Sequence, residues 1–149
     1  MVSIYQRKGD YWLHANAKTT MGVFLAVAST KHLPSNSSSI QLGEAVLELE
    51  SDQERIVEHP SNWKDYIFPL LEPTKCASWS AFVRSQPLLV SVDRQNDNYI
   101  VELHDFDGKG FVPTNPRSTV TILASGGAIL IGQAVLALMQ TQESEQAAP

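Results

Sequence analysis

The chain has 149 residues, a length that fits one domain and that buries roughly 68–70% of the unfolded surface on folding. Its 43% apolar and 18% charged residues exclude an intrinsically disordered protein. The net charge of −5 disfavours direct nucleic-acid binding, because a phosphate backbone repels an acidic surface, and favours a basic protein partner.

Cysteine content and hydropathy indicate a compartment. Cys76 is a single cysteine, which excludes an internal disulfide and fits a reducing environment. The start of the chain, Met1–Lys8, enters strand-like sequence without the apolar stretch of about 7–15 residues that export requires. The most apolar window, Ala124–Met139, is shorter than the roughly 20 residues that span a bilayer. We therefore expect a cytoplasmic protein with no membrane segment and a buried helix in this window.

Three strands are predicted first, at Ser3–Gln6, Tyr11–Ala15 and Met21–Ala28, with a tight turn at Lys8-Gly9-Asp10 between the first two. A polar loop comes next at Leu33–Ser39, in which a serine can cap the next helix. That helix begins near Gln41 or Leu42 and runs to Glu50. Its apolar residues recur at helical spacing on one face: Leu42, Ala45, Val46 and Leu49.

Residues 51–86 read as a helical insertion. Pro60-Ser61-Asn62 before Trp63 is a helix-start signal, Pro69 and Pro73 interrupt the helix after it, and Ser78–Arg84 predicts a second short helix. We expect this insertion to cover part of the sheet.

The last part of the chain repeats the first. Strands are predicted at Leu88–Val92, Tyr99–His104 and Ser118–Leu123, followed by a helix over Ala128–Gln142. A loop containing Gly108-Lys109-Gly110 and Pro113–Pro116 separates the second and third of these strands. Residues 143–149 are expected to form a flexible tail.

A short pattern occurs in both helices, as Leu42-Gly43-x-Ala45-Val46-Leu47 and Ile131-Gly132-x-Ala134-Val135-Leu136. Together with the strands before each copy it indicates a βββα unit used twice. Because short turns pair strands antiparallel, the sequence predicts one α+β domain over residues 1–149, with a mostly antiparallel sheet and the helices on one face. Glycine inside both helices suggests close approach to a neighbour.

Candidate chemistry is sparse. His14 and His104 hold matching places in the two units and suggest a paired site, but no metal-ligand spacing surrounds them, so structural histidines are favoured. Cys76 lies in no nucleophile signature. Asp105 and Asp107 lack the further oxygen ligands of a cation loop and are more typical of a solvated turn. We therefore expect no catalytic residue, no metal and no cofactor.

An acidic stretch is the strongest charge feature. Residues 44–58 contain six carboxylates and one arginine. A solvated helix face is the ordinary interpretation, and a surface complementary to a basic partner is the functional one. The predicted partner-binding residues are Glu44, Glu48, Glu50, Asp52, Glu54 and Glu58.

Motifs in a fixed order along nearly the whole chain resemble a known family. They are Tyr5 with Gly9-Asp10-Tyr11-Trp12-Leu13-His14, the Leu42-Gly43-x-Ala45-Val46-Leu47 helix, Pro60 with Trp63, Ser78-Trp79-x-x-Phe82, and Gly108-x-Gly110-Phe111-x-Pro113. Their order and spacing resemble the immunity proteins of contact-dependent growth inhibition systems.

The resemblance implies a cytoplasmic protein that binds and neutralises a toxin domain delivered by neighbouring bacteria, commonly a nuclease, and that is not an enzyme. Partner contacts vary within such families, so Trp79, Gly110 and Phe111 are expected to serve folding. A second hypothesis from another class stays open, namely a small ligand-binding or enzymatic α+β domain with a pocket near His14 and His104. A deep pocket with converging polar groups would favour that second hypothesis.

Overall fold

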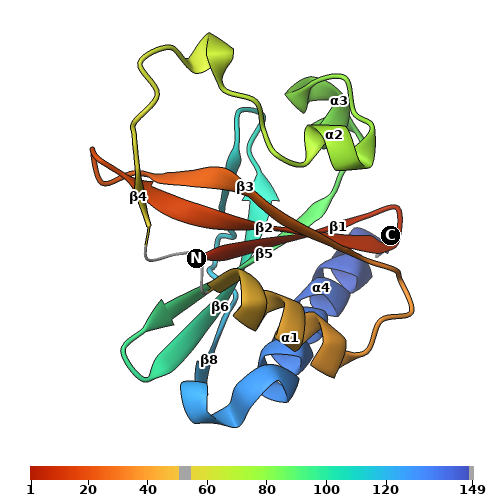
Figure 1. Cartoon of the computed structure of the whole chain (residues 1–149). Coiled ribbons are helices and arrows are strands. Elements are labelled where there is room, and N and C mark those ends of the chain that lie inside the picture. Colours follow the sequence, from red (N-terminus) through yellow and green to blue (C-terminus); the bar gives the residue numbers. More distant parts are fainter. Residues whose placement is uncertain (51–54, 148–149) are drawn as a thin grey trace.

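One sheet separates two unlike layers (Figure 1). The computed structural model describes residues 1–50 and 55–147, and across these residues eight strands form the sheet. Two helices, α1 (Ser39–Glu50) and α4 (Gly127–Ala147), cover one face, and the segment between the two units covers part of the other. The predicted α+β class, with both repeat helices on one face, is confirmed.

The sheet shows the repeat directly. The first unit supplies β1 (Val2–Arg7), β2 (Asp10–Thr19) and β3 (Phe24–Leu33). The second supplies β5 (Leu88–Gln95), β6 (Asn98–Phe106), β7 (Phe111–Pro113) and β8 (Thr119–Leu123). The strand order is β3-β2-β1-β5-β6, with β7 and β8 pairing consecutive parts of β6. The two units therefore meet at the antiparallel pair β1–β5, with β3 at one edge and β7 and β8 at the other. The short strand β7 is a correction, because a loop was predicted between Tyr99–His104 and Ser118–Leu123.

The turn between β1 and β2 is determined by its residues. Lys8 and Gly9 have φ values of 51° and 85°. Two consecutive residues with positive φ give the turn whose twist matches a β-hairpin, and glycine adopts this conformation at little cost. The predicted turn is confirmed.

The third strand corrects the prediction. It begins at Phe24 and not at Met21, because the chain turns at Gly22, whose φ is 79°. It continues to Leu33, which pairs with Tyr11 of β2. Its polar second half gave no strand signal in the sequence, because pairing with the long strand β2 imposes the extended conformation.

The two repeat helices pack closely through their glycines. A Cβ atom on Gly43 would lie 1.7 Å from the carbonyl oxygen of Ala128, and one on Gly132 would lie 1.7 Å from that of Ser39. Each glycine thus admits the backbone of the other helix, and the predicted close approach is confirmed. Before α1, Ser38 Oγ accepts the Gln41 amide N–H at 3.2 Å, which is the expected serine cap.

The helix-covered face holds the main core. Alternate residues of β1, β2, β5 and β6 point to the helices and are almost fully buried, because one face of each strand is covered. The core joins these strand residues to side chains of both helices. Its largest almost fully buried side chains are Ile4, Leu13, Leu42, Leu103, Ile131 and Met139.

The C-terminal helix is longer than predicted. It ends at Ala147 and not at Gln142, so part of the predicted tail is helical; residues 148 and 149 lie outside the described residues. Gln, Glu and Ala, which continue this helix, are good helix formers. By length and composition Ala124–Glu145 would suffice to cross a membrane, yet Ile131, Val135 and Met139 are buried against the sheet and α1.

The insertion is less helical than predicted. It contains β4 (Ile56–Val57), which pairs parallel with β2, a 3-10 turn η1 (Trp63–Asp65), and the short helices α2 (Leu71–Thr74) and α3 (Trp79–Arg84). The start signal at Asn62 yields one turn, and Tyr66 then leaves it and donates to the Ala26 carbonyl at 2.9 Å. The second short helix is present as predicted, and Ser78, included in the predicted range, is its N-cap residue.

Aromatic rings join the insertion to the sheet. Phe82 of α3 is fully buried and meets Tyr5 of β1 at 5.1 Å between ring centroids. Phe68, Trp79 and Phe111 pack around this pair. The insertion therefore covers part of the second face of the sheet, as predicted.

Candidate functional site

The acidic residues predicted to contact a partner do not all face solvent. Glu44 and Glu48 lie on the outer side of α1, and Glu58 is exposed after β4. Glu48 forms an ion pair with Lys31 of β3. Asp52 and Glu54 lie outside the described residues.

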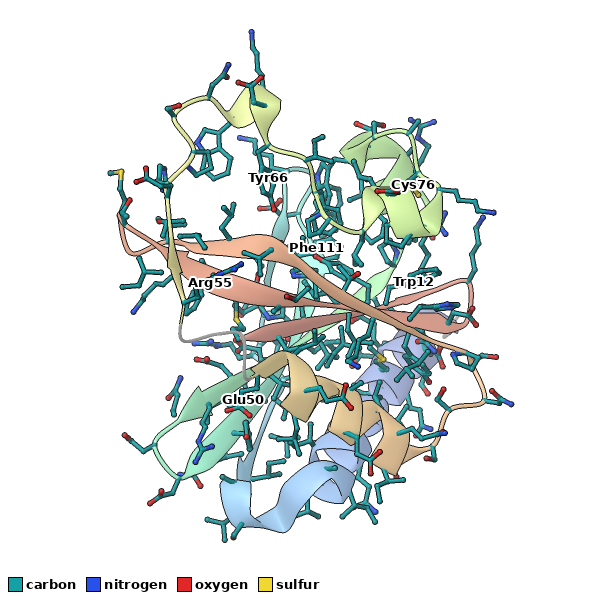
Figure 2. All side chains as sticks on the ribbon, in the orientation of Figure 1. Trp12, Glu50, Arg55, Tyr66, Cys76 and Phe111 are labelled. Carbon is teal, nitrogen blue, oxygen red and sulfur yellow. The ribbon has the colours of Figure 1, made fainter. Side chains whose placement is uncertain are left out.

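Glu50 is turned into the molecule. At the end of α1 its carboxylate accepts a hydrogen bond from the Tyr99 hydroxyl and lies 3.7 Å from the Arg94 guanidinium (Figure 2). Burial, with a smaller contribution from Glu50, raises the pKa of Tyr99 to about 12. Glu50 therefore ties α1 to β6, a role that the charge pattern of the helix could not indicate.

A cavity of about 260 Å³ lies between the sheet and the insertion. His14 and His104 both line it, so the structure brings together the two histidines that the repeat places in matching positions. Aromatic walls come from Tyr5, Phe68, Trp79 and Phe111, of which Phe111 is labelled in Figure 2. Sequence reasoning missed three further polar lining residues: Ser3, Asn16 and Ser91. Their signal was a polar residue between two apolar neighbours in a predicted or extended strand.

His14 is a buried, neutral side chain. It is 2% exposed, and its Nδ1 donates to the carbonyl oxygen of Ala15 at 3.0 Å, which leaves Nε2 as an acceptor without a partner among the described residues. Burial lowers the pKa of His14 to about 4, and the hydrogen bond to Ala15 opposes this only in part. The imidazole is therefore uncharged at neutral pH.

His104 contacts a serine. Its Nε2 lies 2.8 Å from Ser91 Oγ on the neighbouring strand β5, while its Nδ1 is buried without a partner among the described residues. Burial is the largest cause of a lowered pKa of His104; the charge of Arg117 adds to it, and Glu102 and Asp105 oppose it. In a nucleophilic site a serine is paired with a neutral imidazole that acts as its base, and a third group orients the imidazole ring. Here no described residue binds Nδ1 of His104 to orient the ring. Glu102, the acid two residues away, instead binds Arg117 at 2.6 and 2.8 Å.

The remaining candidates have structural surroundings. Cys76 lies between α2 and α3, half-buried against the aromatic cluster. Asp107 accepts the backbone N–H groups of Lys109 and Gly110, which lowers its pKa and closes the β6–β7 turn. Among the described residues, no three histidine, cysteine, aspartate or glutamate side chains are grouped so as to hold a metal ion.

Comparison with known proteins identifies related folds. No family model and no curated protein matches the sequence. The structure is similar to a chain of a CdiA-CT/CdiI toxin and immunity complex from Yersinia pseudotuberculosis, with a TM-score of 0.71 and 8% identity over 93% of this chain and 94% of that one. It is also similar to a protein of unknown function from Neisseria meningitidis, with a TM-score of 0.67 and 10% identity over 94% and 93% of the two chains. The chain thus has a fold that occurs in a toxin and immunity complex.

Proposed function

We propose that this chain is a cytoplasmic immunity protein that binds and neutralises the toxin domain of a contact-dependent growth inhibition system. The observation that carries the proposal is the end-to-end fold similarity to a chain of a toxin and immunity complex. The ordered sequence motifs resemble immunity proteins of the same kind of system, and this likeness does not depend on the fold.

Charge favours the inhibitor side of such a pair. A net charge of −5 suits a protein that occupies or borders a basic surface, and toxins that cleave nucleic acids need a basic substrate cleft. We therefore propose a basic nuclease domain as the partner. Inhibition by occupation is stoichiometric and requires no catalytic residue and no cofactor.

The proposed contact surface consists of the predicted acidic residues other than Glu50. Glu44, Glu48 and Glu58 are exposed, and Asp52 and Glu54 belong to the same stretch. Exposed charges of this kind act mainly on the rate of encounter with an oppositely charged partner. Glu50, which binds Tyr99 and lies beside Arg94, is better explained as an internal residue.

The test measures binding of this chain to the toxin domain that we propose the adjacent gene to encode, and the protection of cells from that domain. The expected result is a one-to-one complex and survival of cells that express the immunity chain. In Glu44→Lys with Glu58→Lys, association at low salt should slow about tenfold and depend less on ionic strength. The matched control reverses two exposed glutamates of α4, Glu143→Lys and Glu145→Lys, and should associate at nearly the wild-type rate. Equal slowing of association in both variants would show that the acidic stretch is not part of the interface.

A second candidate function rests on the cavity shared by His14 and His104. An enzymatic or ligand-binding domain would use the Ser91–His104 contact, which lies at 2.8 Å. Ser91→Ala would then abolish protection in a folded, equally abundant protein. Under the immunity proposal the same variant protects cells as well as wild type, and protection requires at least one copy per toxin molecule.

A further inference from the structure

A groove lies in the second unit, beside the end of α4. It has a volume of about 740 Å³ and is formed where α3 leads into β5, where β6 meets β7, and where α4 ends. The lining residues that can recognise a ligand are Gln86, His104, Asp105, Phe106, Phe111 and Gln142.

Its polar groups are chiefly hydrogen-bond acceptors. The carboxylate of Asp105 is exposed and accepts one hydrogen bond, from Gln142 Nε2 at 2.6 Å. Gln142 Oε1 is then a buried acceptor with no partner among the described residues. His104 adds Nδ1, which has no partner either and is an acceptor when Nε2–H donates to Ser91.

No lysine or arginine is among the groove's described lining residues. Arg117, whose charge acts on His104, binds Glu102, and Arg7 donates to Ser85 Oγ at 2.9 Å. An aromatic surface completes the groove: Phe106 is 40% exposed and its ring lies 5.4 Å from that of Phe111. Acceptors, an unneutralised carboxylate and an aromatic face together match a planar cation that donates hydrogen bonds.

We propose that this groove binds a guanidinium group, the side chain of an arginine on the surface of a basic protein partner. The guanidinium is planar and presents five N–H donors, so it can donate to the exposed Asp105 carboxylate while it stacks on Phe106. A lysine ammonium lacks both the plane and the fork of donors. That the arginine belongs to a protein partner rests on the proposed function. The preference of the groove for a guanidinium group does not depend on that function.

The test is a titration of the ¹⁵N-labelled whole chain with Nα-acetyl-arginine amide, followed by NMR. We expect saturable shifts of the side-chain amides of Gln86 and Gln142 and of the backbone amide of Phe106. Nα-acetyl-lysine amide should bind more weakly, and the neutral isostere Nα-acetyl-citrulline amide should not saturate. Absence of saturation with the arginine compound, or equal binding of all three compounds, would overturn the proposal.

Variants separate binding from folding. Asp105→Asn keeps an oxygen that accepts from Gln142, so the fold is retained while the dissociation constant for the arginine compound should rise about tenfold. Phe106→Leu should raise it about threefold through loss of the aromatic face. Asp65→Asn removes an exposed carboxylate of η1 and serves as the control with wild-type affinity. Unchanged affinity in Asp105→Asn would show that Asp105 only anchors α4, which contradicts the proposal.

The toxin distinguishes this inference from the function on which it partly rests. If the chain is an immunity protein that uses the groove, Asp105→Asn weakens the complex with the toxin domain and Asp65→Asn does not. Tight binding of the toxin by Asp105→Asn removes the groove from the interface and leaves the proposed function standing. Binding of the arginine compound without any toxin complex overturns the proposed function and keeps the groove's specificity.

Discussion

The two faces of the sheet differ in what they bury. On β5, Val90 and Val92 point to the helices and belong to a core of apolar side chains. On the other face the same strand presents Ser91, which is also buried but contacts His104 of the neighbouring strand in the wall of the cavity. One face is therefore a continuous apolar layer, and the other combines aromatic packing with buried polar groups.

We assign stability mainly to the helix-covered face and recognition mainly to the insertion-covered face. The helix-covered face is made by the repeated unit, whose interdigitating helices leave no room for a Cβ at Gly43 or Gly132. The insertion covers the second face only in part, and Trp12 Nε1, His14 Nε2 and His104 Nδ1 are buried there without a partner among the described residues. Unpaired buried polar atoms cost free energy, so they are expected where a protein keeps cavities and binding surfaces.

The largest effect is expected at the helix contact. Gly43→Ala or Gly132→Ala places a methyl group 1.7 Å from a backbone oxygen of the other helix, so the helices must separate. We expect each change to lower the free energy of unfolding by about 3 kcal/mol, measured by urea denaturation. Gly110→Ala is the control, because nothing lies within 4 Å of the position that its added methyl group would take, and it should change stability little. A loss below about 1 kcal/mol at Gly43 and Gly132 would contradict the close-packed layer.

The second effect is a pH dependence that arises on the insertion-covered face. The pKa of His14 is about 4 in the folded state against an ordinary value of 6.5, so below pH 6.5 the unfolded chain binds more protons and stability decreases as the pH is lowered. Its contribution is complete above pH 6.5 and should decrease by about 2 kcal/mol between pH 7.5 and pH 5. The lowered pKa of His104 acts in the same direction.

Urea denaturation at the two pH values measures this dependence. His14→Gln should reduce the difference between them by about 2 kcal/mol, whatever its effect at pH 7.5. His32→Gln, a change at a histidine that stacks on Trp12 outside the cavity, should retain the decrease that comes from His14. An equal pH dependence in wild type and His14→Gln would show that His14 is not a buried neutral group.

A pair of neighbouring residues sharpens the comparison between the faces. Val90→Ala removes apolar volume from the helix-covered core and should cost about 2 kcal/mol. Ser91→Ala removes the partner of His104 Nε2 at 2.8 Å and should cost about 1 kcal/mol. Both values come from thermal or urea unfolding at pH 7.5. A larger loss for Ser91→Ala than for Val90→Ala would mean that the polar face contributes more to stability than the apolar one.

The smallest effects distinguish two carboxylates of α1. Glu50→Gln weakens the contacts with Tyr99 and Arg94 and should cost about 1 kcal/mol. Glu44→Gln alters an exposed side chain and should remain within about 0.5 kcal/mol of wild type. Calorimetry of the two variants measures their free energies of unfolding. Equal values would show that Glu50 contributes no more to stability than Glu44.

Local signals account for much of the fold and little of the candidate sites. The turn at Lys8-Gly9, the serine cap of α1 and the glycines of both helices act over a few residues, so their sequence patterns were sufficient. The inward position of Glu50 depends on Tyr99, which lies in the other unit. The guanidinium groove likewise joins Asp105 to Gln142, residues that become neighbours only when α4 packs on the sheet.

The sequence by itself determined the duplicated βββα plan, the class of fold and the face on which both helices lie, because strand alternation, helical spacing and glycine use are periodic and local. Tertiary structure alone decided that His14 and His104 share one cavity, that β3 extends through its polar half and that the insertion is mostly irregular. These features depend on strand pairing and packing between segments distant in sequence, and the free energy of such contacts is set by the partner as much as by the residue itself.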